Sequence, residues 1–133
     1  MSEAYRQGLK EIALIDPESG KAFVEELKRV SPDFSDYFVE FAFGTIHSRS
    51  VLEPKIKELI AVANLTVLGQ GQSHLKLSIL AAIRVGCSKE EILEVIIQTV
   101  IYAGFMRAII ALNLVKEAYE EGGSPFSDPT KSA

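Results

Sequence analysis

Apolar residues recur at intervals of three and four along most of the chain, which is the spacing of one face of an α-helix. The pattern predicts a first helix whose apolar face is formed by Tyr5, Leu9, Ile12 and Ala13. Asp16-Pro17 and Ser31-Pro32 each place a capping side chain before a proline, which favours the start of a helix. The two helices that they open carry apolar stripes formed by Phe23, Leu27 and Val30, and by Phe34, Tyr37, Phe38 and Phe41.

The aromatic stripe of the third helix is expected to lie in the core, since such stripes usually face inward. Gly44 is predicted to end this helix, and 45–52 is predicted to be a loop. Glu53-Pro54 starts a fourth helix, whose aligned apolar residues are Ile56, Leu59, Ile60, Ala63 and Val67. Two nearby glycines, Gly69 and Gly71, favour a turn that interrupts it.

The second half of the chain continues the helical pattern. A fifth helix is predicted from about Gln72 to Val85, with an inward face of Leu75, Ile79, Ala82 and Ile83. Ser88 to Glu91 has the spacing of a capping box, which opens the next helix. Residues 92–102 also have strand propensity, but the capping box and the length favour a helix. Gly104 predicts a break before a last helix that ends near residue 121.

These elements predict an all-α fold of six to seven helices. A chain of 133 residues is expected to form one domain, here residues 1–123, followed by a flexible tail at 124–133. Residues 92–112 are apolar on nearly every side, so they need more cover than one small subunit provides. The sequence therefore predicts a homo-oligomer.

Charge and composition exclude several classes of protein. The chain has 14 basic and 18 acidic residues and no basic cluster, which disfavours nucleic-acid binding. Its most apolar stretch is interrupted by Glu94 and Arg107 and falls short of the ~20 residues of a membrane span. The first residues lack the apolar segment of an export signal, so a cytoplasmic location is expected. The single cysteine, Cys87, allows neither an internal disulfide nor a cysteine-based metal cluster.

Three stretches of the sequence, 48–60, 81–92 and 98–104, resemble the carboxymuconolactone decarboxylase family, which also contains the alkylhydroperoxidase D (AhpD-like) proteins. The first carries an arginine, a short loop ending in leucine, and a helix with Lys-Glu-Leu; the second is a small-residue helix, a glycine turn and a capped acidic start; the third is Gln-x-x-x-Tyr-Ala-Gly. The resemblance implies an all-α, AhpD-like bundle built on a helical hairpin, assembled as a trimer or as a hexamer of dimers.

The chain departs from the AhpD-like pattern C-x-x-C-x-x-x-H, whose positions are occupied here by Gly71, His74 and Ser78. Disulfide-based peroxide chemistry needs a nucleophilic thiolate and a resolving thiol, so a peroxidase or oxidoreductase is the least favoured function. In the decarboxylase branch the histidine thought to act as the acid falls at Ser78. Because the turn is one residue longer than usual, His74 is an alternative for that role.

His74 and Ser78 are four residues apart and project from the same helix face. Glu58 lies on the preceding helix, so the three side chains are predicted to converge between the hairpin arms. Glu58 would orient His74, which would transfer a proton near neutral pH. The alternative is that His74 is a polar first-turn residue and that Glu58 pairs with a surface lysine such as Lys57 or Lys55.

Four further residues are candidates for substrate binding. The Arg49 guanidinium suits a substrate carboxylate, although an inter-subunit or capping ion pair is an equal alternative. Gln72 offers hydrogen bonds, but hairpin turns are commonly polar. His47 and Tyr102 are more often structural in such positions. The leading interpretation is a cofactor-free decarboxylase, or a related lyase, for a small carboxylated lactone or similar acid. The alternative is a non-catalytic oligomeric binding protein that keeps the fold.

Overall fold

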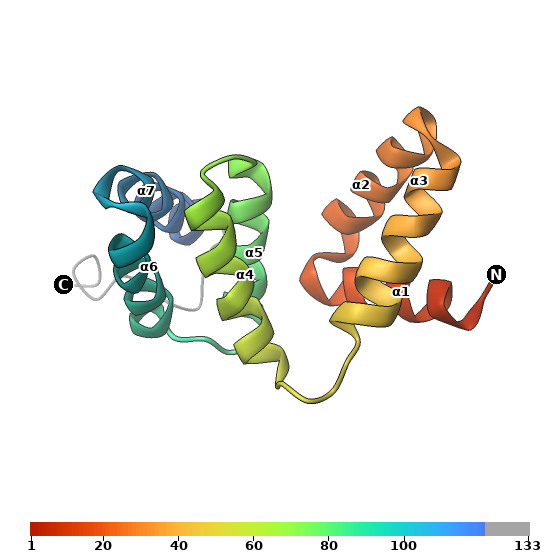
Figure 1. Ribbon diagram of the computed structural model, residues 1–133, viewed down its shortest axis with the longest axis horizontal. Coiled ribbons are helices and arrows are strands. Elements are labelled where there is room, and N and C mark those ends of the chain that lie inside the picture. Colours follow the sequence, from red (N-terminus) through yellow and green to blue (C-terminus); the bar gives the residue numbers. More distant parts are fainter. Residues whose placement is uncertain (122–133) are drawn as a thin grey trace. The chain divides into compact units, whose positions relative to one another are not determined.

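The computed structural model describes residues 1–121, and helices account for nearly all of this range (Figure 1). The absence of strands from the described residues, 92–102 included, confirms the all-α prediction. The predicted tail at 124–133 lies outside the described residues. The elements are α1 (Glu3–Ile15), α2 (Pro17–Val30), α3 (Pro32–Tyr37), the π-helix η1 (Phe38–His47), α4 (Pro54–Leu68), α5 (Gln72–Arg84), α6 (Lys89–Ala103) and α7 (Phe105–Glu121).

The predicted caps explain where several helices begin. The Asp16 carboxylate accepts the backbone N–H groups of Glu18 and Ser19 at the start of α2, and Ser31 caps α3 in the same way. The Ser88–Glu91 capping box is formed in both directions at the start of α6. These side chains satisfy backbone donors that have no partner within the helix, so local sequence fixes these helix starts.

The chain forms two compact units, Met1–Glu53 and Pro54–Ala133. In the first unit, α1 crosses η1 at backbone contact distance. A Cβ added to Gly8 would stand 2.0 Å from the Val39 carbonyl oxygen, and one added to Gly44 would stand 2.0 Å from the Ala4 carbonyl oxygen. Only glycine allows two backbones to approach this closely.

The prediction that Gly44 ends the third helix, with a loop at 45–52, is therefore wrong in its boundary. The helix continues through η1 to His47, and Gly44 serves the crossing with α1. The Ser48 backbone N–H donates to the Phe43 carbonyl at 3.1 Å, the five-residue spacing of a π-helix. The connection to α4 thus begins at Ser48 rather than at Thr45.

The prediction that the aromatic stripe of this helix lies in the core is also wrong for the single chain. Phe34, Tyr37 and Phe41 are exposed, whereas Ser35 and Val39 are fully buried. The reason is the glycine crossing, because a backbone contact with α1 turns the small-residue face of the helix inward. Of the predicted stripe, Phe38 alone is half-buried, and it packs beside Phe23 and Phe43.

In the second unit, α4 and α5 form the predicted hairpin, and α6 and α7 pack against it (Figure 1). Leu75, Ile79 and Ala82 of α5 are buried as predicted. The aligned apolar residues of α4 are placed differently, since Ile56, Ile60 and Val67 are exposed. The buried face of α4 consists of Glu58, Val62 and Thr66.

One side chain of α7 completes the hairpin turn. Arg107 Nη1 donates to the Leu68 carbonyl at 2.7 Å, at the C-terminal end of α4. A cation at this end is favourable because the last helical carbonyls lack partners and carry partial negative charge. The guanidinium occupies the space beside Gly69, whose φ of 70° is left-handed, so α7 and the turn are held together.

Candidate functional site

Glu58 lies on the second turn of α4 and is only 4% exposed. Burial is the main cause of the raised pKa of the Cys87 thiol, and the charge of Glu58 makes the smallest contribution to that shift. A buried carboxylate is costly to the fold, and such groups cluster at functional sites. Glu58 is therefore the strongest candidate among the residues predicted from the sequence.

Cys87 is fully buried, and its Sγ donates to the Lys55 carbonyl at 3.5 Å. Burial is the largest cause of its raised pKa, followed by the negative charge of Glu91; Lys55 opposes the shift. The thiol therefore stays protonated at neutral pH. Because thiolate is the nucleophilic form, this environment argues against a thiol-dependent reaction.

An ion pair between Lys55 and Glu91 lies next to the turn between α5 and α6. Lys55 Nζ lies 3.0 Å from Glu91 Oε1, and that oxygen also accepts the Ser88 backbone N–H at 2.9 Å. The backbone hydrogen bond from Ser88, then the bond from Lys55, lowers the pKa of Glu91. Glu91 is thus an ionised carboxylate that holds Lys55 near the buried Glu58.

His74 lies in the first turn of α5 and is exposed, beside the turn at Gly71. Glu58 is ten residues before the end of α4, and His74 is two residues after the start of α5. With a rise of about 1.5 Å per residue in an antiparallel hairpin, their levels differ by about 12 Å. The convergence of Glu58 and His74 between the hairpin arms stays a prediction.

Ser78, one turn further along α5, is half-buried and differs from Glu58 by about 6 Å in level. It is thus nearer to Glu58 than His74 is. Gln72 is exposed at the start of α5. Gly71, just before it, has φ 70°, and a Cβ added there would stand 4.0 Å from the His74 Cβ.

A depression of about 470 Å³ opens between α4 and α6, next to the Lys55–Glu91 pair. It is lined by Leu59, Ser88, Glu90, Glu91, Glu94, Val95 and Gln98. Its three carboxylates do not complement an acidic ligand unless Lys55 is available to it. None of the residues predicted for the site lines it, although Leu59 directly follows Glu58.

The remaining predicted residues belong to the first unit or to the end of α6. His47 and Arg49 belong to the first unit, where His47 Nδ1 lies 2.8 Å from Glu11 Oε2 and Arg49 is exposed. The Glu11 carboxylate also accepts a hydrogen bond from Gln7 at 3.2 Å. Tyr102 lies near the end of α6 and is 81% exposed. His47 thus has a structural partner, in line with the alternative considered from the sequence.

Sequence reasoning considered Lys55 only as a partner of Glu58, and it missed the contacts of Lys55 with Glu91 and with Cys87. The sequence predicts the capping box that contains Glu91. The additional contact of Glu91 with Lys55 depends on how α6 packs on α4. Among residues 1–121, no group of three histidine, cysteine or acidic side chains is placed to hold a metal ion. Within the same range, no helix is long and apolar enough to cross a membrane.

The fold defines an all-helical protein built on the α4–α5 hairpin. Its candidate site contains a buried glutamate, Glu58, near the start of α4. The chain belongs to the carboxymuconolactone decarboxylase family, whose model matches residues 32–117. It is 26% identical over 122 residues to a 4-carboxymuconolactone decarboxylase of Acinetobacter baylyi, covering 91% of this chain and 90% of that protein. It is also 23% identical over 130 residues to an uncharacterized 15.0 kDa protein of Paracoccus denitrificans, from the nqo9–nqo10 intergenic region, covering 91% and 97% of the two chains.

Proposed function

We propose that the chain is a cofactor-free decarboxylase, or a closely related lyase, that acts on a small carboxylated lactone or similar acid. The observation that carries the proposal is the family match, together with the similarity over 91% of the chain to a protein named as a 4-carboxymuconolactone decarboxylase. The buried Glu58 supports it, because a desolvated carboxylate at a family motif fits a functional role better than a stabilising one.

The reaction requires few catalytic groups from the protein. The bond between the substrate carbon and its carboxylate breaks, carbon dioxide leaves, and the electron pair moves into the conjugated carbonyl of the substrate. A protein acid then delivers a proton to carbon. General acid catalysis of this kind contributes about 10²- to 10⁴-fold in rate.

In this proposal Arg49 binds a substrate carboxylate, and His47, Gln72 and Tyr102 are secondary binding candidates. His74 is the proton donor, with Ser78 as the competing position. Glu58 is proposed to orient His74, with direct action on the substrate or its water as the competing role. Variants at these positions decide between the assignments.

The test is to incubate the purified protein with 4-carboxymuconolactone and follow loss of substrate and release of carbon dioxide. Turnover that falls by about 10²-fold or more in His74→Ala and Glu58→Gln, with the fold retained by circular dichroism, supports the assignment. Lys116→Ala, an exposed change on α7, is the matched control and should keep full activity. A larger loss in Ser78→Ala than in His74→Ala moves the acid role to Ser78.

A second candidate, a non-catalytic oligomeric binding protein, is favoured by one observation: a serine stands where the decarboxylase branch has its histidine, while His74 is exposed. Saturable binding of 4-carboxymuconolactone with no turnover, by calorimetry and product analysis, would support this candidate against the lyase.

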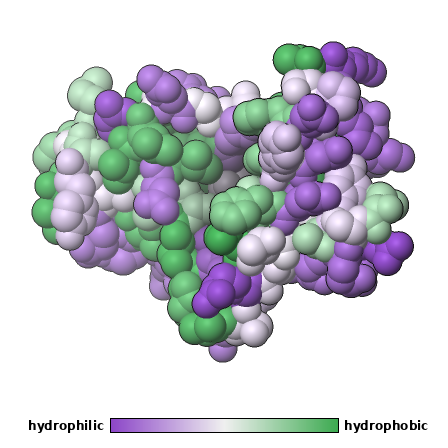
Figure 2. All heavy atoms as spheres, turned by 45° about the vertical axis from the view of Figure 1, so that its right-hand side comes forward, coloured by the Kyte–Doolittle hydropathy of each residue, from purple (hydrophilic) through white to green (hydrophobic). Residues whose placement is uncertain are grey.

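We further propose that the protein is a homo-oligomer, with a trimer or a hexamer as the expected forms. The support is the apolar surface that one chain leaves exposed, part of which is visible in Figure 2. On α6 and α7 its exposed members are Ile97, Ile101, Tyr102, Phe105, Met106, Ile109 and Leu112. Patches of this kind mark interaction surfaces.

A further inference from the structure

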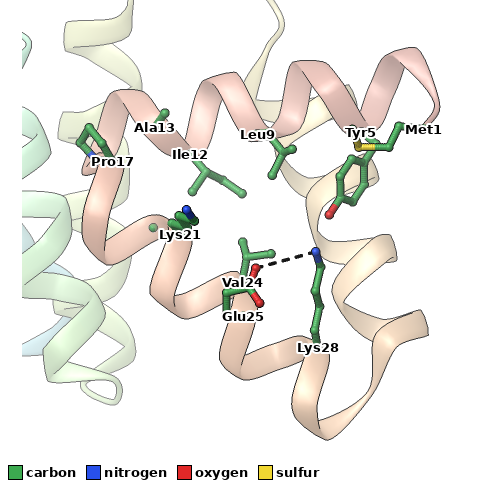
Figure 3. A pocket seen from close by; sticks show the side chains of 11 residues that line it. Met1, Tyr5, Leu9, Ile12, Ala13, Pro17, Lys21, Val24, Glu25 and Lys28 are labelled. Atoms are coloured by element: carbon green, nitrogen blue, oxygen red, sulfur yellow. Dashed lines mark ion pairs between the residues drawn. The ribbon is translucent and has the colours of Figure 1, made fainter.

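A cavity of about 410 Å³ lies between α1 and α2, entirely within the first unit. Its lining is mainly apolar and includes Tyr5, Leu9, Ile12, Ala13 and Val24 (Figure 3). The volume falls within the range of about 300–1,000 Å³ that is typical of small-molecule sites. None of the residues assigned above to the lyase site lines it.

The polar side chains of the cavity are Lys28, Lys21 and Glu25, together with the Tyr5 hydroxyl. Figure 3 shows the Tyr5 hydroxyl and the Lys28 ammonium directed toward one another. A hydrogen bond with Tyr5 is the main cause of the raised pKa of Lys28, which therefore remains a cation. Lys28 Nζ also lies 4.0 Å from Glu25 and 6.0 Å from the centre of the Tyr5 ring.

These contacts fix a cation at the edge of an apolar chamber. An ammonium group has three donors, so Tyr5 leaves others for a ligand. Two lysines and one glutamate line the cavity, and the charge of Asp36 also acts on Lys28, whereas the whole chain has a net charge of −4. The Lys28 ammonium selects an anion, and the apolar lining selects a hydrocarbon body.

We infer that this cavity binds a medium-chain monocarboxylic acid, with its carboxylate at Lys28 and its chain against Leu9, Ile12 and Val24. A neutral lipid gains no charge-assisted hydrogen bond from the Lys28 ammonium, and a strongly polar anion gains nothing from the apolar lining. The site is separate from the proposed lyase site, because it contains neither Glu58 nor His74.

Decanoate is the probe, and decanol is its neutral counterpart. The full-length protein is titrated with each, and binding is followed by calorimetry and by amide chemical shifts in two-dimensional NMR. We expect saturable binding of decanoate, shift changes concentrated in α1 and α2, and decanol weaker by about tenfold or more, since a charge-assisted hydrogen bond is lost.

Lys28→Met keeps the apolar stem and should weaken decanoate by about tenfold or more. Ala13→Phe adds bulk at an exposed position of the lining and should block binding with little effect on folding. Lys10→Met removes the same charge from an exposed position of α1 outside the lining and should bind normally. Thermal unfolding confirms that each variant is folded.

The inference is overturned if decanoate does not saturate below about 5 mM, or if decanol binds equally well. It is also overturned if the shift changes fall outside α1 and α2, or if folded Lys28→Met and Ala13→Phe both bind like the wild type. Sedimentation of the same samples shows whether a second copy of the chain covers the cavity. If such a dimer forms and decanoate does not dissociate it, the inference is also overturned. Turnover of 4-carboxymuconolactone tests the lyase proposal independently.

Discussion

The imidazole of His47 and the carboxylate of Glu11 lie 2.8 Å apart, joining the last turn of η1 to α1. Their side chains are 23% and 12% exposed, so the pair is largely shielded from solvent. The contact acts beside the glycine crossing of the same two helices. The first unit is thus held by this polar contact between side chains in addition to its close backbone packing.

Removing this contact should destabilise the first unit. His47→Ala and Glu11→Ala are each expected to lower the free energy of unfolding by about 1–2 kcal/mol. Each substitution removes the contact between the two side chains and leaves the other, partly buried polar group without it. In a double-mutant cycle the two changes should couple by about 0.5–1.5 kcal/mol. Urea unfolding followed by circular dichroism measures both quantities, and additive effects would show that the pair contributes no interaction energy.

The glycine crossing makes a sharper stability prediction. Gly8→Ala or Gly44→Ala places a methyl group against a backbone carbonyl, so each should destabilise the protein by about 1–3 kcal/mol. Gly20→Ala is the comparison, because its methyl group meets the Ile12 Cγ2 at 2.5 Å and the Ile12 carbonyl oxygen only at 3.1 Å, and it gains helix propensity, so a smaller loss is expected. Equal midpoints of thermal unfolding for all three variants would contradict the crossing.

Cys87 should be unreactive in the folded protein. Burial raises its pKa, so Ellman's reagent is expected to modify it only when denaturant is present. Neither the wild type nor Cys87→Ser should turn over peroxide with a dithiol as reductant. Rapid labelling of the native protein, or peroxide turnover that the substitution abolishes, would refute this prediction.

The Lys55–Glu91 contact predicts a pH dependence. The folded-state pKa of Glu91 is lowered, so its stabilising contribution is present above the unfolded-state pKa of about 4.3. The contribution is lost as the pH falls through the lower folded-state pKa. Glu91→Gln should therefore be less stable than the wild type near pH 7 and approach it at low pH. Thermal unfolding across this range is the measurement, and a constant difference would exclude the linkage.

The exposed faces of α6 and α7 predict that assembly depends on apolar contacts. Ile101→Glu or Phe105→Glu should shift sedimentation toward smaller species, because a buried charge at an interface is strongly unfavourable. Lys10→Glu, on the exposed side of α1, should leave the sedimentation pattern unchanged. A wild-type protein that sediments as a monomer at micromolar concentration would remove the basis of the prediction.

Local sequence signals predicted the helices well, because caps and helix-breaking glycines act over a few residues. Asp16, Ser31 and Ser88 all cap helices as expected. The extension of η1 past Gly44 was missed, because that glycine is used for a contact with Ala4 rather than as a stop. Periodicity alone does not distinguish these two uses.

The faces of the helices were harder to predict than the helices themselves. On α4 three members of the predicted apolar stripe, Ile56, Ile60 and Val67, are exposed while Glu58 is buried, which reverses the usual preference. Thr66 is buried at no cost in hydrogen bonding because its hydroxyl donates to the Val62 carbonyl at 2.7 Å. Lys55 and Glu91 lie far apart in sequence, so their contact depended on packing that no local pattern encodes.

The backbone around Gly71 has a consequence for the engineering of the chain. An added Cβ there stands 4.0 Å from the Cβ of His74, within the 3.5–4.5 Å that joins two half-cystines. Gly71→Cys combined with His74→Cys would therefore place a bridgeable pair of sulfur atoms on the existing turn. The left-handed φ of Gly71 would oppose the first change by about 1–2 kcal/mol. The two substitutions together would give the existing turn a C-x-x-C spacing, with Ser78 unchanged four residues later.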